Sequence, residues 1–136
     1  MPFLPRKGIL AIAAVVDIAL HDGEHPVSAK TLAVRHGLPP RHLEPVLQAL
    51  VRDGILKGVR GPHGGYYLAR ERGRITAEDI MRAAGSVEEQ GEPPLPSSPL
   101  IGNVVRPALA EAERAFSAAL SRINIDDMAK AAEAAK

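Results

Sequence analysis

The sequence predicts a mainly α-helical protein: a winged helix-turn-helix unit of three helices and a two-stranded β wing, followed by a long C-terminal helix. Two short helical segments, at 29–36 and 39–53, are joined by a glycine turn in the helix-turn-helix pattern. Two short apolar runs then flank the turn sequence GPHGG, as in a β-hairpin. Apolar residues also recur at steps of three and four between residues 105 and 123, which is typical of a long amphipathic helix.

The first helix is expected at residues 6–21, where apolar side chains follow helical spacing. Its apolar stretch of 13 residues, GILAIAAVVDIAL, is interrupted by Asp17 and is too short to cross a bilayer. No small-residue cleavage site follows, which argues against a signal peptide. We therefore expect a buried first helix in a cytoplasmic protein without a membrane partner.

The helix-turn-helix segments carry recognisable end signals. Ser28 occupies an N-cap position, and Gly37 stops the helix that Ser28 begins. The next helix opens at Pro39 and Pro40, which suit a first turn, and Gly54 closes it. Pro45 falls in its second turn, so we expect either a later start or a mild kink. One face of this helix is apolar and is expected in the core: Leu43, Val46, Leu47 and Leu50.

The rest of the chain divides into short elements and a linker. Residues 55–60 and 66–69 are expected to be the two strands of the wing. Thr76 then caps a fourth short helix, with Asp79 completing an approximate capping box. Composition changes at residue 86, where prolines and glycines replace the apolar periodicity, and a final short helix or frayed tail closes the chain. The expected organisation is a helix-turn-helix domain at 1–85, a proline-rich linker at 86–103, and a helical dimerisation region at 104–136.

The charge is distributed unevenly along the chain. Residues 1–74 hold eleven Lys and Arg against six Asp and Glu, a net charge of +5, whereas residues 75–136 have a net charge of −4. This asymmetry suggests that the first half meets a polyanion. The chain has no cysteine, which excludes disulfides, thiolate zinc sites and cysteine-ligated iron–sulfur clusters.

The helix-turn-helix pattern points to DNA, because the second helix of such a motif fits the major groove and reads base edges near its N-terminus. Arg41, His42 and Glu44 occupy those positions. Arg41 suits guanine or phosphate, and Glu44 suits either a cytosine amino group or the helix N-terminus as a favourable charge. Arg60, at the root of the glycine-rich turn, suits a narrow minor groove. The alternative for this turn is an ordinary hairpin whose glycines supply positive φ.

The stretch LPPRHLEPVLQALVRDGILKGVRGPHGGYYLAR resembles the signature of the Rrf2 family of bacterial transcription regulators, the IscR-like proteins. The resemblance rests on Leu43-Glu44, on Gly54 and on the wing sequence RGPHGGY, and it extends in order over nearly the whole chain. It implies a homodimer held together by the long helix near 104–123, with Glu44 reading a base and Arg60 entering the minor groove. It also implies a repressor rather than an activator, acting on a palindromic operator.

The sequence departs from that family pattern in three places. Cluster-binding members carry three cysteines in the loop before the dimer helix, and this chain has none there, so a conventional iron–sulfur sensor is excluded. Pro45 replaces a residue that often makes a polar contact, and Arg41 stands where a smaller hydroxyl residue is common. Both differences indicate a different operator. No cofactor and no metal site are expected, because the five histidines (21, 25, 36, 42 and 63) show no convergent ligand spacing.

The expected function is therefore that of a sequence-specific DNA-binding regulator and not that of an enzyme, since no catalytic pair or nucleotide loop stands in an organising context. Two alternatives stay open: a winged helix that binds only proteins, and a regulator whose small-molecule effector lies between the apolar faces of 9–20 and 105–123. The expected DNA contacts are Ser28, Lys30, Arg41, His42, Glu44, Lys57, Arg60, Gly61, His63, Gly64, Gly65 and Tyr66. The expected dimer contacts are Val105, Leu109, Ala112, Phe116, Leu120 and Ile123.

Overall fold

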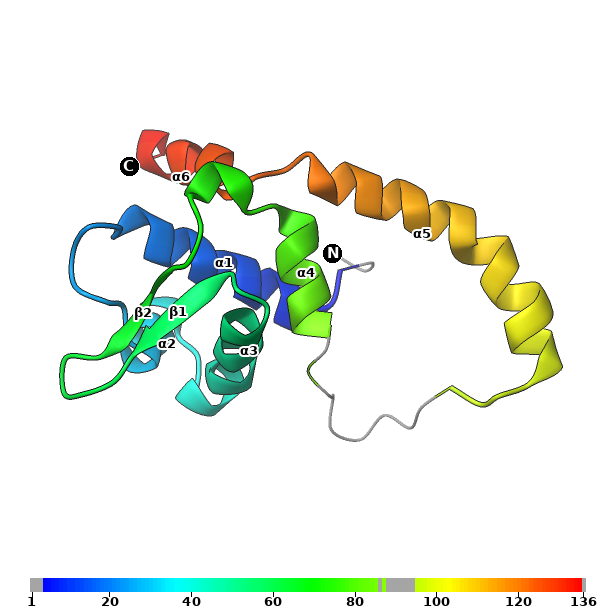
Figure 1. Ribbon diagram of the computed structural model, residues 1–136, viewed down its shortest axis with the longest axis horizontal. Helices are drawn as coiled ribbons and strands as arrows, with labels where there is room; N and C mark the ends of the chain where they lie inside the picture. Colours follow the sequence, from blue (N-terminus) through cyan, green and yellow to red (C-terminus); the bar gives the residue numbers. More distant parts are fainter. Residues whose placement is uncertain (1–3, 86, 88–94, 136) are drawn as a thin grey trace.

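The computed structural model describes residues 4–85, 87 and 95–135, and Figure 1 shows a helical body from which one long helix extends. The body is built around α1 (Arg6–Leu20), which contacts α3, α4, α6 and the second wing strand. Small side chains on α1 allow this close approach. A Cβ added at Gly8 would lie 2.3 Å from the sulfur of Met81 on α4. The expected first helix is confirmed, and its inner face, including Val15 and Ile18, lies in the core.

The helix-turn-helix consists of α2 (Ala29–His36) and α3 (Pro40–Arg52). The side chain of Ser28 accepts a hydrogen bond from the N–H of Thr31 at 3.0 Å, so the expected N-cap is confirmed. Gly37 ends α2 with a φ of 65°, the left-handed conformation that glycine adopts without steric cost. The core face of α3 is also as expected, since Leu43, Val46, Leu47 and Leu50 are all buried.

Pro45 lies inside α3, and the helix begins at Pro40, so the later start considered from the sequence is wrong. The missing N–H of Pro45 leaves only the carbonyl of Arg41 without its helical partner. Both residues are exposed, so the carbonyl of Arg41 lies close to solvent. The missing helical hydrogen bond therefore costs little free energy. The apolar face of α3 supplies the burial that holds the helix together despite the lost bond.

The wing is an antiparallel pair, β1 (Leu56–Val59) and β2 (Gly65–Leu68), with Val59 opposite Gly65 at its outer end. Val27, in the loop between α1 and α2, adds an isolated bridge to Tyr66, with N–H to carbonyl distances of 3.1 and 2.8 Å. The wing therefore starts from a fixed base on the helix-turn-helix. Sequence periodicity did not predict this bridge, because it joins single residues far apart in the chain.

After the wing the chain forms a 3-10 turn (Arg72–Arg74), α4 (Ala77–Gly85), a π-helical turn (Ile101–Val105), α5 (Arg106–Ser121) and α6 (Ile125–Ala134). The expected capping box at the start of α4 is confirmed by reciprocal bonds of 3.1 Å between Thr76 and Asp79. Helical structure begins within the segment expected as a linker at 86–103, of which residues 86 and 88–94 lie outside the described residues. In the described part of the chain, no helix has the length and apolar character needed to cross a membrane.

The last segment is a helix packed on the body, and not a frayed tail. The side chain of Asn124 caps α6 by accepting a bond from the N–H of Asp127 at 2.9 Å. Ile125 and Ala129 are fully buried against the core that includes α1. Because α6 returns to the body, the C-terminal end of α5 is held there, while its other end extends away (Figure 1).

Candidate nucleic-acid interface

The outer face of α3 presents the polar side chains that were expected to read bases. Arg41, His42 and Glu44 are all exposed, whereas Leu43 between them is only 1% exposed and anchors the helix. Glu44 is the fifth residue of α3 and lies beyond its first turn. The favourable field of a helix N-terminus fades within that turn, which weakens the alternative explanation of Glu44 as a helix-end charge.

Glu44 also lies close to the wing. Burial raises the pKa of the Tyr66 phenol, and the negative charge of Glu44 raises it further. Tyr66 therefore keeps its proton at neutral pH, and its hydroxyl remains a hydrogen-bond donor near the carboxylate. This electrostatic contact connects β2 to the outer face of α3, two elements that the sequence could not place relative to each other.

The tip of the wing is shaped by close backbone contacts. The N–H of Gly64 donates to the carbonyl of Gly61 at 2.9 Å, and a Cβ at Gly64 would lie 2.2 Å from the carbonyl oxygen of Val59. A Cβ at Gly65 would lie 2.6 Å from the backbone of Val27 and 2.8 Å from the nitrogen of Ser28. A side chain at either position would overlap backbone atoms, so both positions require glycine. The close contact of Gly65 with Val27 and Ser28 places the wing against the start of α2.

Two open hollows flank the wing and bring several of the expected contacts together. One, of about 390 Å³, places Ser28 and Tyr66 beside Arg60. The other, of about 460 Å³, places His25 and Ser28 beside His63. The structure therefore brings the start of α2 and the wing tip to one surface.

Lys57 has a different setting. It pairs with Tyr67 across the hairpin, and its Nζ lies 5.8 Å from the centre of the Tyr67 ring. Side chains alternate along a strand, so Lys57 lies on the opposite face of the wing from Tyr66.

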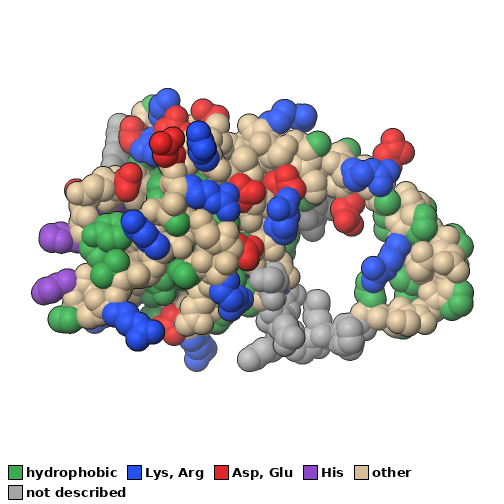
Figure 2. All heavy atoms as spheres, in the orientation of Figure 1, with side chains coloured by type: hydrophobic (Ala, Val, Ile, Leu, Met, Phe, Trp, Pro, Cys, Tyr) green, Lys and Arg blue, Asp and Glu red, His purple; other side chains and the backbone are tan. Residues whose placement is uncertain are grey.

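Several positive charges on this surface have no neutralising partner among the described residues. In the part that the structure describes, Lys30, Arg41 and Arg60 form no ion pair. Figure 2 shows Lys and Arg side chains along the edge of the molecule below the hairpin and α3, while most Asp and Glu side chains of that face lie in the upper half. Such a surface attracts an anionic polymer.

A buried carboxylate that the sequence marked only as an interruption holds α2 in place. Asp17, 7% exposed, pairs with Nη1 of Arg35 and lies 3.0 Å from Nε2 of His36, both at the end of α2. Nδ1 of His21, the residue that caps the C-terminal end of α1, lies 3.4 Å from the same carboxylate. The spacing of four residues between Asp17 and His21 was the available signal, but their partners on α2 became visible only in the fold.

We expect Asp17→Asn to lower the free energy of unfolding by about 2 kcal/mol, because it leaves Arg35 facing an amide in place of a buried carboxylate. Denaturant titration followed by circular dichroism would measure this loss. Asp22→Asn is the matched control, since Asp22 is exposed and has no ion pair in the described chain. Equal stability of the two variants would show that the Asp17 cluster does not stabilise the packing of α2.

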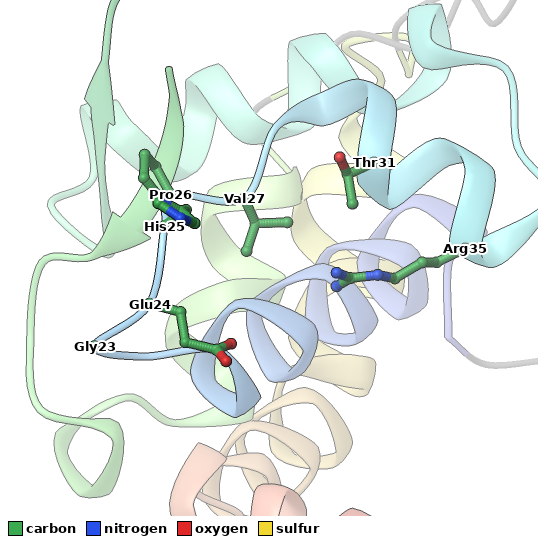
Figure 3. A pocket seen from close by; sticks show the side chains of 7 residues that line it. All are labelled: Gly23, Glu24, His25, Pro26, Val27, Thr31 and Arg35. Atoms are coloured by element: carbon green, nitrogen blue, oxygen red, sulfur yellow. The ribbon is translucent and has the colours of Figure 1, made fainter. Parts of the chain in front are cut away.

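A further hollow, of about 670 Å³, opens between α2 and the loop that precedes it (Figure 3). Loop residues form one side, and Thr31 and Arg35 of α2 form the other. The effector pocket considered from the sequence lay elsewhere, between residues 9–20 and 105–123. The residues that line the hollow are Gly23, Glu24, His25, Pro26, Val27, Thr31 and Arg35.

The apolar stripe of α5 faces solvent in the single chain. None of the residues of α5 is buried, and Leu109 and Phe116 are 59% and 41% exposed. Val105 and Ile123, at the two ends of the stripe, are 40% and 38% exposed. Ala112 is also exposed, and Leu120 is half-buried. An exposed apolar stripe of this length is typical of an interaction surface.

Comparison with known proteins gives a family match over most of the chain. The profile of the Rrf2 family, described as iron-dependent transcriptional regulators, matches residues 4–131. The regulator IscR of Xenorhabdus nematophila is 39% identical over 80 residues, which are 59% of this chain and 49% of that protein. CymR of Bacillus subtilis is 37% identical over 79 residues, 58% of this chain and 57% of that protein. The chain thus spans about half the length of the curated relatives it matches.

Solved structures agree with the fold. IscR of T. potens has a TM-score of 0.74 at 34% identity, over 98% of this chain and 90% of that one. CymR of B. subtilis, the global cysteine regulator, has a TM-score of 0.72 at 27% identity, over 96% and 98% of the two chains. These matches confirm the mainly helical winged fold. The relatives are transcriptional regulators and not enzymes.

The residues of this chain do not fit an iron–sulfur cluster. The sequence has no cysteine, the ligand that such clusters require. Within residues 4–85, 87 and 95–135, no three His, Asp or Glu side chains are grouped so that they could hold a metal ion. His21 and His36 instead surround Asp17 together with Arg35, whose positive charge opposes a cation there.

Proposed function

Because the chain belongs to the Rrf2 family of transcriptional regulators, we propose that it binds a palindromic DNA operator as a homodimer and represses transcription there. The observation that carries the proposal is the positive charge of Lys30, Arg41 and Arg60 on the helix-turn-helix and the wing, which forms no ion pair among the residues that the structure describes. In this proposal α3 enters the major groove, and the wing reaches the adjacent minor groove. The chain has no cysteine to hold an iron–sulfur cluster, so in this proposal it binds the operator without one.

The second copy is proposed to cover the stripe of α5. Apolar side chains that are about half exposed along a whole helix are costly to leave in water, and an identical helix offers a matching stripe. A dimer of this kind has twofold symmetry, which an operator with two inverted half-sites matches. The proposed interface comprises Val105, Leu109, Ala112, Phe116, Leu120 and Ile123.

The proposal is tested by selecting bound duplexes from a random DNA pool at near-physiological salt. We expect enrichment of one palindrome. If the pool yields only general, salt-sensitive binding, the sequence-specific function is wrong, and a winged helix that binds proteins becomes the better explanation. Repeating the selection with small molecules from cell extract tests the alternative of an effector that controls binding.

We expect Glu44→Ala to relax the selected operator at one base pair in each half-site, because one carboxylate contact to a base contributes about 1–3 kcal/mol of discrimination. The same pool selection measures this change. Glu24→Ala removes an exposed carboxylate outside α3 and the wing and serves as the control for charge. An unchanged operator for Glu44→Ala would contradict base reading by Glu44.

A further inference from the structure

The end of α5 is tied to the body through residues 69–79, which we call the junction segment. Figure 1 shows α5 approaching the body with its C-terminal end, where the chain turns into α6. The N–H of Ala77 donates to the carbonyl of Ile123 at 2.8 Å, and the N–H of Ile125 donates to the carbonyl of Ile75 at 2.9 Å. The orientation of α5 relative to the body therefore depends on this joint together with the packing of α5 against α4.

Charged side chains of the junction segment and of α6 form a network across this joint. Nε of Arg72 donates to Oδ1 of Asp126 at 2.8 Å, and Nη1 of Arg72 lies 3.8 Å from the carboxylate of Glu133. Nζ of Lys130 lies 2.9 Å from the other oxygen of Asp126. Hydrogen bonds from Lys130 and Arg72 lower the pKa of Asp126, so the carboxylate is charged at neutral pH. Arg72 is thus the side chain that connects the junction segment to two turns of α6.

The same junction segment holds the end of α3. Nε of Arg70 donates to the carbonyl of Gly54 at 3.2 Å, and its Nη2 donates to the carbonyl of Asp53 at 3.1 Å. Nη1 of Arg70 also reaches the carboxylate of Asp79 at 3.3 Å, at the start of α4. One residue separates this arginine from Arg72. A short segment therefore contacts both the helix proposed to read DNA and the helix that anchors α5.

We propose that Arg72 is a specificity-determining residue that sets the spacing between the two half-sites of the operator. It acts by fixing the orientation of α5 relative to α3 within each protomer. This inference rests on the proposed function, a dimer joined through α5. One added base pair moves the second half-site by about 3.4 Å and rotates it by about 35°. A dimer with a stiff joint binds half-sites displaced in this way poorly, whereas a dimer with a loosened joint can still bind them.

The test measures binding to the palindrome selected by the unaltered protein and to duplexes whose half-sites are one or two base pairs closer or farther apart. We expect Arg72→Ala to reduce the preference for the original spacing about fivefold, while binding to a single half-site is unchanged. Asp126→Asn keeps the shape of the partner and should give the same result. Thermal unfolding of both variants checks that the fold is retained.

Arg74→Ala is the matched control. Arg74 belongs to the same 3-10 turn, its side chain is 82% exposed, and among the described residues it forms an ion pair with Glu71 and none with α6. A spacing preference that is the same in Arg72→Ala, Asp126→Asn and Arg74→Ala would overturn the inference and leave the proposed function intact. An unaltered protein that binds all spacings equally would also overturn it. Failure of the unaltered protein to bind any palindrome would instead contradict the proposed function.

Discussion

Changing Leu109 and Phe116 together to glutamate should convert the protein to a monomer and weaken binding to the palindromic operator by about 100-fold or more. The loss is large because a monomer binds each half-site separately and forfeits the high effective concentration of the second. Both side chains are about half exposed in the single chain, so each protomer should keep its fold. Sedimentation measures the mass, and titration of a labelled operator measures the affinity.

Arg114→Glu provides the control for this variant. It changes the net charge by the same amount, −2, and it is also exposed on α5. At about 100° per residue, however, it lies about 140° around the helix from Leu109 and away from the stripe. A double variant that remains dimeric would place the interface elsewhere on the molecule.

Replacing Arg60 with alanine should weaken operator binding about tenfold or more. It should also reduce the slope of log affinity against log salt concentration by about one unit for each protomer. Arg60 is exposed at the outer end of the wing, directly after β1, and forms no ion pair in the described chain, so its charge is available to DNA. Affinity measured over a range of salt concentrations gives both quantities from one series of titrations.

Arg106→Ala removes the same charge from α5, outside the helix-turn-helix and the wing. It should leave the salt dependence close to that of the unaltered protein. If Arg60→Ala and Arg106→Ala behave alike, the wing does not contact the DNA backbone or groove, and the affinity depends on net charge alone.

Local signals predicted the elements of the body well, because caps and turns depend on neighbouring residues. Ser28 and the Thr76–Asp79 pair cap their helices as expected. The wing strands also formed on either side of the expected turn. The first, Leu56–Val59, is shorter than the predicted 55–60, and the second, Gly65–Leu68, has the predicted length but begins one residue earlier. For the interface, the sequence indicated the exposed positions on α3 and at the wing tip.

Contacts between distant segments could not be predicted from periodicity. The docking of α6 depends on Ile125 reaching the core, and nothing in a short helix indicates which surface it will cover. Asp17 stands out in its apolar run, but its partners Arg35 and His36 follow on another helix. Nothing in the sequence marks Arg70 and Arg72, because only the fold brings the end of α3 and the helix α6 next to them.

Gly64 and Gly65, at the outer end of the wing, separate a part of the hairpin that is fixed from a part that can change. Any side chain at Gly64 or Gly65 would collide with backbone atoms, so substitution there would displace the whole hairpin. Pro62 and His63 are exposed at the tip and are free of that restriction. On the proposed function, new operator preferences would arise by changing the tip alone, and libraries that aim to redirect the protein should vary residues 62–63 and keep the two glycines constant.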